Sequence, residues 1–199
     1  MNTFNLFPTP VAFFKLPNEL TEEQLEFLKN AEQRPNEGNT TSKFREVLDH
    51  ELFADLKEFV MESLNTYFDN TISPMNDVKL RVTQSWLNYT KKGQWHHKHA
   101  HPNSVISGVF YVNADKEKDK IFFYKDGYKQ LSFPTERYNE YNSDSWWLPV
   151  GTNELVLFPS SFTHSVAPVE TDETRISLAF NTFPVGDVGS DDSLTGLKL

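Results

Sequence analysis

The sequence of 199 residues contains no cysteine. A disulfide framework, a thiolate metal site and a thiol nucleophile are therefore excluded, and nitrogen and oxygen atoms must hold any bound metal. Long apolar runs are also missing, because no window reaches the ~20 residues of a membrane-spanning helix. Residues 1–16 lack the basic start and the apolar stretch of a secretory signal. We therefore expect a soluble, cytoplasmic protein with no membrane partner.

Basic residues are scarce. Lys and Arg number 19 against 28 Asp and Glu, which gives a formal net charge of -9. No basic stripe that could follow a phosphate backbone stands out, so we do not expect nucleic acid as a partner. The length suits one domain with a sizeable core and is short for two.

Two helical patterns precede a series of strand patterns. Residues 16–33 contain a capping box at Thr21 and Gln24, and residues 51–70 place apolar side chains at helical spacing. From residue 79 onward we expect strands at 80–90, 105–113, 121–124, 154–158 and 175–183. This order predicts an α+β, mainly β fold built around a sandwich or jelly roll, with the N-terminal helices packed on one sheet.

We predict a single domain over residues 1–199. Residues 1–78 would form an N-terminal helical support, 79–184 the jelly-roll core, and 185–199 a flexible tail with little apolar content. The segment 125–151 is long, aromatic and contains proline. Because loops of that length often act as lids or binding walls, we expect this segment to select the substrate.

Four of the six histidines fall within residues 94–102. In an extended strand, alternate residues share a face, so His97, His99 and His101 would point to one side and His96 to the other. Positions four apart are about 13 Å apart, whereas metal to imidazole nitrogen distances are about 2.1 Å. The ligand pair is therefore His97 with His99, or His99 with His101. A histidine-rich strand end without a metal is the alternative.

A third ligand must come from a distant strand, and His164 follows an apolar run that ends at Pro159. Eleven residues later, Arg175 opens another strand pattern, whose alternation places Arg175 and Ser177 on one face. A guanidinium beside a hydroxyl can bind a carboxylate. The alternative role for Arg175 is a surface ion pair.

These residues resemble the iron and 2-oxoglutarate dependent oxygenases, specifically their prolyl-hydroxylase-like branch, over roughly residues 85–183. The elements that follow the branch in order are Tyr89, Gly93, His99-Ala100-His101, Tyr111-Val112-Asn113, Phe158-Pro159, His164, Pro168-Val169 and Arg175. The spacing from Gly93 matches the family's and selects His99 and His101 over His97. The run after His101-Pro102 also looks like a small subgroup with a His-x-His-Pro motif.

The resemblance implies a double-stranded β-helix and a 2-oxoglutarate-dependent dioxygenase that uses Fe(II), 2-oxoglutarate and dioxygen. His99, His101 and His164 would be the catalytic metal ligands. Arg175 and Ser177 would bind the distal carboxylate of 2-oxoglutarate, with Tyr111 as a further partner and Tyr89 near the keto-acid end. His101 stands where the family has Asp or Glu, so three neutral imidazoles would hold the metal.

The sequence thus predicts an enzyme that decarboxylates 2-oxoglutarate to succinate and hydroxylates a second substrate, either a peptidyl residue or a small molecule. One alternative is a cupin-like jelly-roll protein that binds a metal and is not an oxygenase. A weaker alternative is an interaction module without a metal. The role of Arg175 separates the first two hypotheses.

Overall fold

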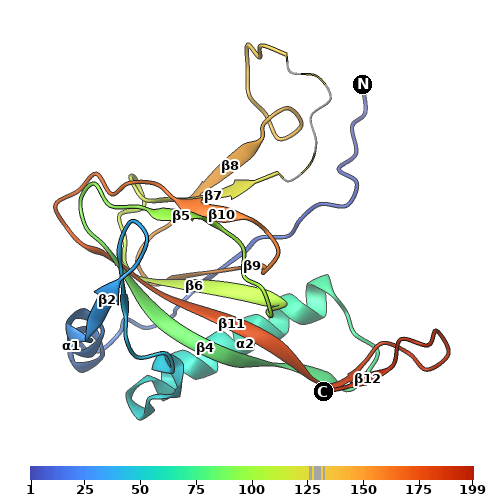
Figure 1. Cartoon of the computed structure of the whole chain (residues 1–199), viewed down its shortest axis with the longest axis horizontal. Coiled ribbons are helices and arrows are strands. Elements are labelled where there is room, and N and C mark those ends of the chain that lie inside the picture. Colours follow the sequence, from blue (N-terminus) through green and yellow to red (C-terminus); the bar gives the residue numbers. More distant parts are fainter. Residues whose placement is uncertain (126, 128–130, 132) are drawn as a thin grey trace.

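The computed structural model describes residues 1–125, 127, 131 and 133–199. Within them, two antiparallel sheets lie one above the other (Figure 1). The larger sheet has the order β1-β9-β6-β11-β4-β3-β2, with β12 paired to β11, and the smaller has the order β5-β10-β7-β8. The strands of the larger sheet are β1 Ala12–Lys15, β2 Gln33–Pro35, β3 Thr40–Ser42, β4 Val78–Thr90, β6 Ile106–Asn113, β9 Glu154–Pro159, β11 Arg175–Val188 and β12 Leu197–Lys198. Those of the smaller sheet are β5 His96–His99, β7 Lys120–Tyr124, β8 Ser145–Pro149 and β10 His164–Val166.

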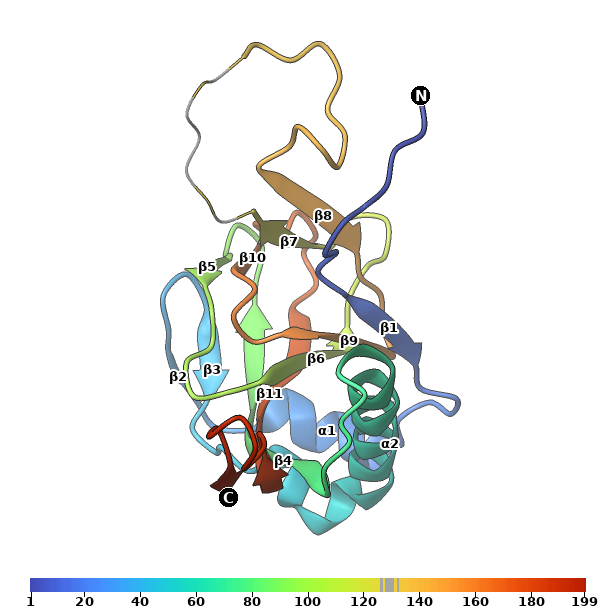
Figure 2. The same cartoon turned by 90° about the vertical axis from the view of Figure 1, so that its right-hand side faces the viewer.

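Two α-helices cover the outer face of the larger sheet, on the side away from the smaller sheet (Figures 1 and 2). Helix α1, Glu22–Asn30, begins with the expected capping box, because the Thr21 hydroxyl accepts from the Gln24 backbone and the Gln24 side chain accepts from the Thr21 backbone. Helix α2, Ala54–Thr71, follows two short 3-10 turns, Val47–Asp49 and Glu51–Phe53. The predicted packing of the helices on one sheet is confirmed.

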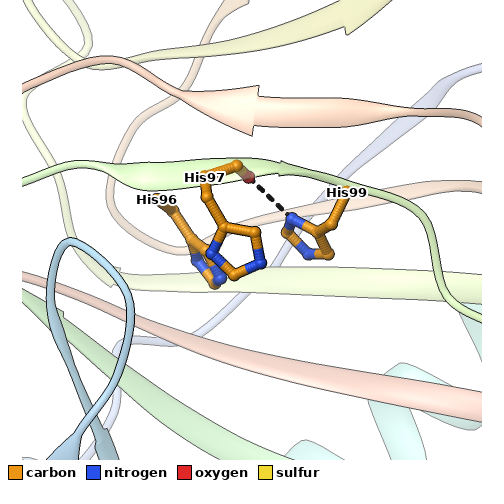
Figure 3. Close-up of side chains that lie close together, drawn as sticks. All are labelled: His96, His97 and His99. Carbon is orange, nitrogen blue, oxygen red and sulfur yellow. Dashed lines mark hydrogen bonds between the residues drawn. The ribbon is translucent and has the colours of Figure 1, made fainter.

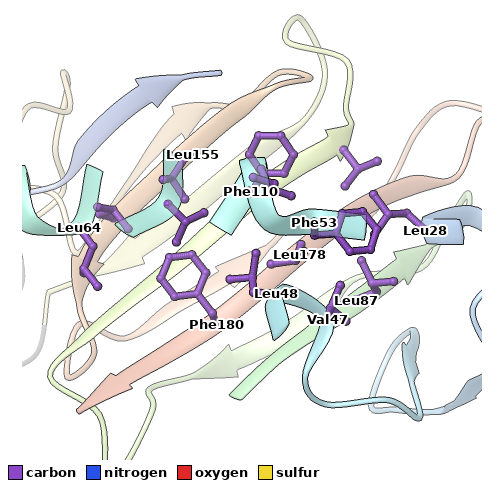
Figure 4. Packing of buried hydrophobic residues seen from close by; sticks show 14 of the residues in the cluster. Leu28, Val47, Leu48, Phe53, Leu64, Leu87, Phe110, Leu155, Leu178 and Phe180 are labelled. Atoms are coloured by element: carbon purple, nitrogen blue, oxygen red, sulfur yellow. The ribbon is translucent and has the colours of Figure 1, made fainter. Parts of the chain in front are cut away.

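The main core fills the space between α2 and the larger sheet (Figure 4). Leu64 from the helix side and Phe110, Leu155, Leu178 and Phe180 from the strands are fully buried there. Because side chains alternate along a strand, the neighbouring residues of β4, β6 and β11 point to the opposite face, toward the smaller sheet. The two faces of these long strands therefore serve the core and the cavity between the sheets.

The predicted strands are present, but several others were not expected. Strands β1, β2 and β3 lie in the part predicted to be helical support, and β8 pairs with β7 inside the segment 125–151. Strand β11 also runs past residue 184 to Val188 and pairs with β12 through the backbones of Gly186 and Leu199. The low apolar content of the tail does not prevent this pairing, since backbone groups carry it. No helix among the described residues is both long and apolar enough for a bilayer span.

Candidate metal centre

Three histidines meet between the two sheets. His164 on β10 lies opposite His99 on β5, and His101 follows β5, where its backbone N–H donates to the Ser160 carbonyl at 2.9 Å. One ring nitrogen from each of His99, His101 and His164 lies within 4.8 Å of the others. The structure therefore brings together the three residues that the sequence nominated as metal ligands.

Backbone contacts orient two of these rings. The Nδ1 atoms of His99 and His164 lie 2.8 and 3.0 Å from the carbonyl oxygens of His97 and Phe162. Since a carbonyl only accepts, each Nδ1 carries the proton, and each Nε2 keeps its lone pair for a metal. The Nε2 atoms of His101 and His164 are 3.4 Å apart. Two nitrogens bound to one ion at ~2.1 Å with angles of 90–110° lie roughly 3.0–3.4 Å apart, so the spacing fits a shared metal.

Burial keeps the imidazoles neutral. Burial, followed by the influence of the nearby His99, lowers the pKa of His101 to about 4 and the pKa of His164 to about 3. Metal binding requires an unprotonated nitrogen, so these rings need not lose a proton near pH 7 before they bind an ion.

A second group of histidines, His96, His97 and His99, also brings its ring nitrogens within 4.8 Å (Figure 3). The prediction that His96 points away from His99 is wrong, because their rings stack with centroids 4.7 Å apart. The pairing explains the error: His99 and His96, three residues apart, pair with His164 and Val166, two residues apart. This bulge adds one residue to β5 and shifts the alternation of its side chains. The Nδ1 of His99 is occupied by the His97 carbonyl, so His99 can bind a metal only through Nε2. The two histidine groups share His99 and therefore compete for it.

Arg175 opens β11 inside the same cavity of about 420 Å3. Its side chain is only 4% exposed, and its Nη1 donates to Oδ1 of Asp119 at 2.9 Å, so the alternative of a surface ion pair is wrong. The Nη2 of Arg175 and the hydroxyl of Tyr111 are buried and have no hydrogen-bond partner among the described residues. Buried donors without partners indicate a missing acceptor, and the pair fits a carboxylate.

The other residues predicted to bind 2-oxoglutarate differ in position. Ser177 lies next to Arg175 on the cavity face, and burial raises the pKa of Tyr111, so its phenol stays protonated as a donor. Tyr89 does not reach the cavity: it lies on the core face of β4, where its hydroxyl donates to the Leu28 carbonyl at 2.6 Å. The expected contact between Tyr89 and the keto acid is therefore contradicted. The alternation of β4 places Trp86 and Asn88 in the cavity instead.

Two residues that line the cavity, and the partner of Arg175, were not anticipated from the sequence. Asp119 carries no motif signal, since it precedes a strand of ordinary composition. Arg34 of β2 and Arg45, which follows β3, line the cavity from the N-terminal part of the chain. The described residues of segment 125–151 do not line it, and residues 126, 128–130 and 132 of that segment lie outside the described part.

Residues 84–181, about half of the chain, match the family model described as "Putative 2OG-Fe(II) oxygenase". The matched span contains the three candidate ligands and Arg175. The chain belongs to the superfamily of 2-oxoglutarate and Fe(II) dependent oxygenases. Comparison with curated proteins finds no match. Membership in the small subgroup with a His-x-His-Pro motif stays a prediction.

Solved oxygenase structures share the fold at low identity. An oxidoreductase of the 2OG-Fe(II) oxygenase family from Burkholderia pseudomallei has a TM-score of 0.57 at 10% identity, over 86% of this chain and 83% of that one. A prolyl-4-hydroxylase from Pseudomonas putida has a TM-score of 0.54 at 13% identity, over 87% and 92%. HygX from Streptomyces hygroscopicus, bound to nickel, 2-oxoglutarate and hygromycin B, has a TM-score of 0.51 at 12% identity, over 85% and 82%. These likenesses confirm the double-stranded β-helix of the oxygenases.

Proposed function

We propose that the chain is an Fe(II) and 2-oxoglutarate dependent dioxygenase that hydroxylates a second substrate. One observation carries the proposal: a single cavity holds three convergent imidazoles and, on the facing sheet, buried donors of Arg175 and Tyr111 that lack partners among the described residues. A site for a metal alone would need only the first of these features. The second feature matches the distal carboxylate of a keto acid.

His99, His101 and His164 would hold the iron, and Arg175, Tyr111 and Ser177 would bind the distal carboxylate of 2-oxoglutarate. When bound, the iron and 2-oxoglutarate supply the oxidation: dioxygen gives one oxygen atom to succinate, formed with loss of carbon dioxide, and the other to a C–H bond, which becomes an alcohol. Two neighbours support these cofactors, since HygX is bound to nickel and 2-oxoglutarate and the epimerase SnoN to Fe3+ and alpha ketoglutarate.

The chain's own residues prepare the site. Asp119 holds one edge of the Arg175 guanidinium and leaves Nη2 free to donate. Apolar side chains of Val109, Ile121 and Val166 line the same cavity and limit the water around the reacting groups. With His101 in place of a carboxylate, the ligand set is neutral, so the uncompensated charge of the ion favours a dianionic keto acid.

The fold leaves the primary substrate open. Similar solved structures include a prolyl-4-hydroxylase, an epimerase of nogalamycin biosynthesis and HygX in complex with hygromycin B. Peptidyl and small-molecule acceptors are both compatible with such a range, because a fold does not determine a substrate.

The test is an anaerobic titration with Fe(II) and 2-oxoglutarate, which follows the visible charge-transfer band of a chelated keto acid. We expect the band in the wild type and in the control Arg81→Gln, whose side chain is exposed on β4, and its loss in His101→Ala and Arg175→Glu. Succinate formation in air is the second readout. Zinc binding without any band, and no succinate above background, would contradict the proposal and indicate a metal-binding jelly roll.

A further inference from the structure

The cavity gathers the arginines of an acidic protein. The chain contains 28 Asp and Glu, yet none of the described residues that line the cavity is acidic. The arginines of the chain are Arg34, Arg45, Arg81, Arg137 and Arg175. Three of them, Arg34, Arg45 and Arg175, line this cavity. In a chain with more acidic than basic residues, this lining is therefore enriched in positive charge, which favours negative groups.

The three arginines differ in their partners. Arg175 is neutralised by Asp119, whereas neither Arg34 nor Arg45 forms an ion pair with any residue in the described part. Arg45 donates from Nη1 to the Thr41 hydroxyl at 3.4 Å, and its buried Nη2 has no hydrogen-bond partner there. A buried guanidinium nitrogen without an acceptor is costly, and a ligand oxygen would satisfy it.

Arg34 and Arg45 also repel each other electrostatically. Burial lowers the pKa of Arg45, the positive charge of Arg34 lowers it further, and Glu46 partly offsets both. Two like charges near one another at a cavity wall favour the binding of an anion between or beside them.

The position of Arg45 points to the reacting end of the cavity. Its carbonyl accepts from the Ser85 backbone N–H at 2.8 Å, which ties it to β4. The next residue on β4, Trp86, faces the cavity, and its ring centroid lies 6.0 Å from that of His101. A group held at Arg45 therefore lies on the same cavity wall as Trp86, which leads to the proposed metal ligands. Arg175, the proposed 2-oxoglutarate contact, lies on a different strand, β11.

The charges of the proposed cofactors leave no counter-charge for these two arginines. The two positive charges of the iron would be matched by the two negative charges of 2-oxoglutarate, and Arg175 is matched by Asp119. Nothing in the proposed cofactor set matches Arg34 and Arg45. Their charge is available to the second substrate.

We propose that Arg45 and Arg34 bind a carboxylate of the primary substrate, and that this oxygenase hydroxylates a small acidic compound or an acidic residue of a peptide. This inference rests on the proposed function for the reaction. It concerns residues of the same cavity, Arg34 and Arg45, that lie outside the residues that match the oxygenase family. The balanced reaction converts substrate C–H, dioxygen and 2-oxoglutarate to C–OH, succinate and carbon dioxide.

The test compares acid and amide probes of equal shape. The protein is loaded with Zn(II) and 2-oxoglutarate and titrated at constant ionic strength with butanoate or butanamide, and with the capped peptides acetyl-Gly-Glu-Gly-amide or acetyl-Gly-Gln-Gly-amide. Binding is followed by the NMR resonance of the Trp86 indole N–H, assigned with Trp86→Phe. We expect at least one acid to bind about tenfold or more tightly than its amide. The pair that shows the preference identifies a free acid or a peptidyl residue as the substrate class.

The variants locate the effect. Arg45→Gln and Arg34→Gln should each reduce the preference for the acid, whereas the matched control Arg81→Gln should keep it. Equal affinity for acids and amides, no binding of any probe, or an undiminished preference in Arg45→Gln would overturn the proposal. Failure of the proposed function is seen separately, as the absence of the 2-oxoglutarate band in the wild type. The probe titration can then be repeated on the protein with zinc alone.

Discussion

Replacement of Arg175 by Gln should reduce the affinity for 2-oxoglutarate strongly. The guanidinium is 4% exposed and offers a free Nη2 to the ligand. Removal of one partner from a buried, hydrogen-bonded charge pair costs about 2–5 kcal/mol. At ~1.4 kcal/mol per factor of ten, the dissociation constant should rise by roughly 30-fold to several thousand-fold. The assay is the anaerobic titration of the charge-transfer band.

The same substitution also removes the partner of Asp119. That carboxylate is 7% exposed, and after the change its one remaining side-chain hydrogen bond among the described residues is the one that its Oδ2 accepts from the Asp115 backbone at 2.8 Å. A buried charge that loses its partner costs about 3–5 kcal/mol of unfolding free energy. Urea unfolding should detect this loss, and the single variant alone would not separate lost binding from lost folding.

The double variant Arg175→Gln with Asp119→Asn separates the two effects. Two neutral amides replace the buried pair, and the amide oxygen introduced at position 119 can still accept from the Asp115 backbone, so most of the unfolding free energy should return. The affinity for 2-oxoglutarate should remain low, because the cationic donor is still missing. Wild-type affinity in the double variant would refute the role of Arg175 in binding. An undiminished stability of Arg175→Gln would refute the buried pair itself.

Three further predictions test the metal ligands, the core and the titration of the histidines. His164→Ala should lower metal retention after dialysis by roughly tenfold or more while His97→Ala keeps it; the reverse order would assign the ion to the group around His96. Gly108→Ala should cost at least ~1–3 kcal/mol in urea unfolding, because the new Cβ would lie 2.1 Å from Cζ of Phe180; an unchanged midpoint would contradict this packing. The metal-free protein should lose stability from about pH 6.5 to pH 4, since unfolded histidines protonate near 6.5 but the folded pKa values of His101 and His164 are about 4 and about 3. The slope is at most ~1.4 kcal/mol per pH unit for each ring, so a flat profile over this range would exclude the buried neutral state.

The parts of the fold with a strong local signal were predictable. The apolar spacing of residues 51–70 gave α2, and the capping box gave the start of α1. Alternation along residues 175–183 correctly placed Arg175 and Ser177 on one face of β11. These features depend on neighbours in sequence, so local motifs and periodicity are enough to predict them.

Features that depend on pairing between distant strands were not predictable. The bulge that turns His96 toward His99 exists only because β5 pairs with β10, some 65 residues away. Strands of three residues, such as β2 and β3, carry too few side chains for a recognisable alternation. Asp119 neutralises Arg175 across 56 residues, and nothing in its own surroundings in the sequence marks that partnership.

The separation of Arg34 and Arg45 from the family match has a consequence for substrate choice. Residues 84–181 contain the proposed metal ligands and every proposed 2-oxoglutarate contact, and they form strands of both sheets. The β2–β3 hairpin lies at the edge of the larger sheet, where Thr40 and Thr41 pair with Tyr89 and Asn88 of β4. An edge hairpin can change its side chains without disturbing the core between α2 and the sheet. Substrate selection can therefore vary in residues 33–45 while the cofactor chemistry stays constant, and related chains that keep the ligands but lack arginines at these positions should prefer uncharged substrates.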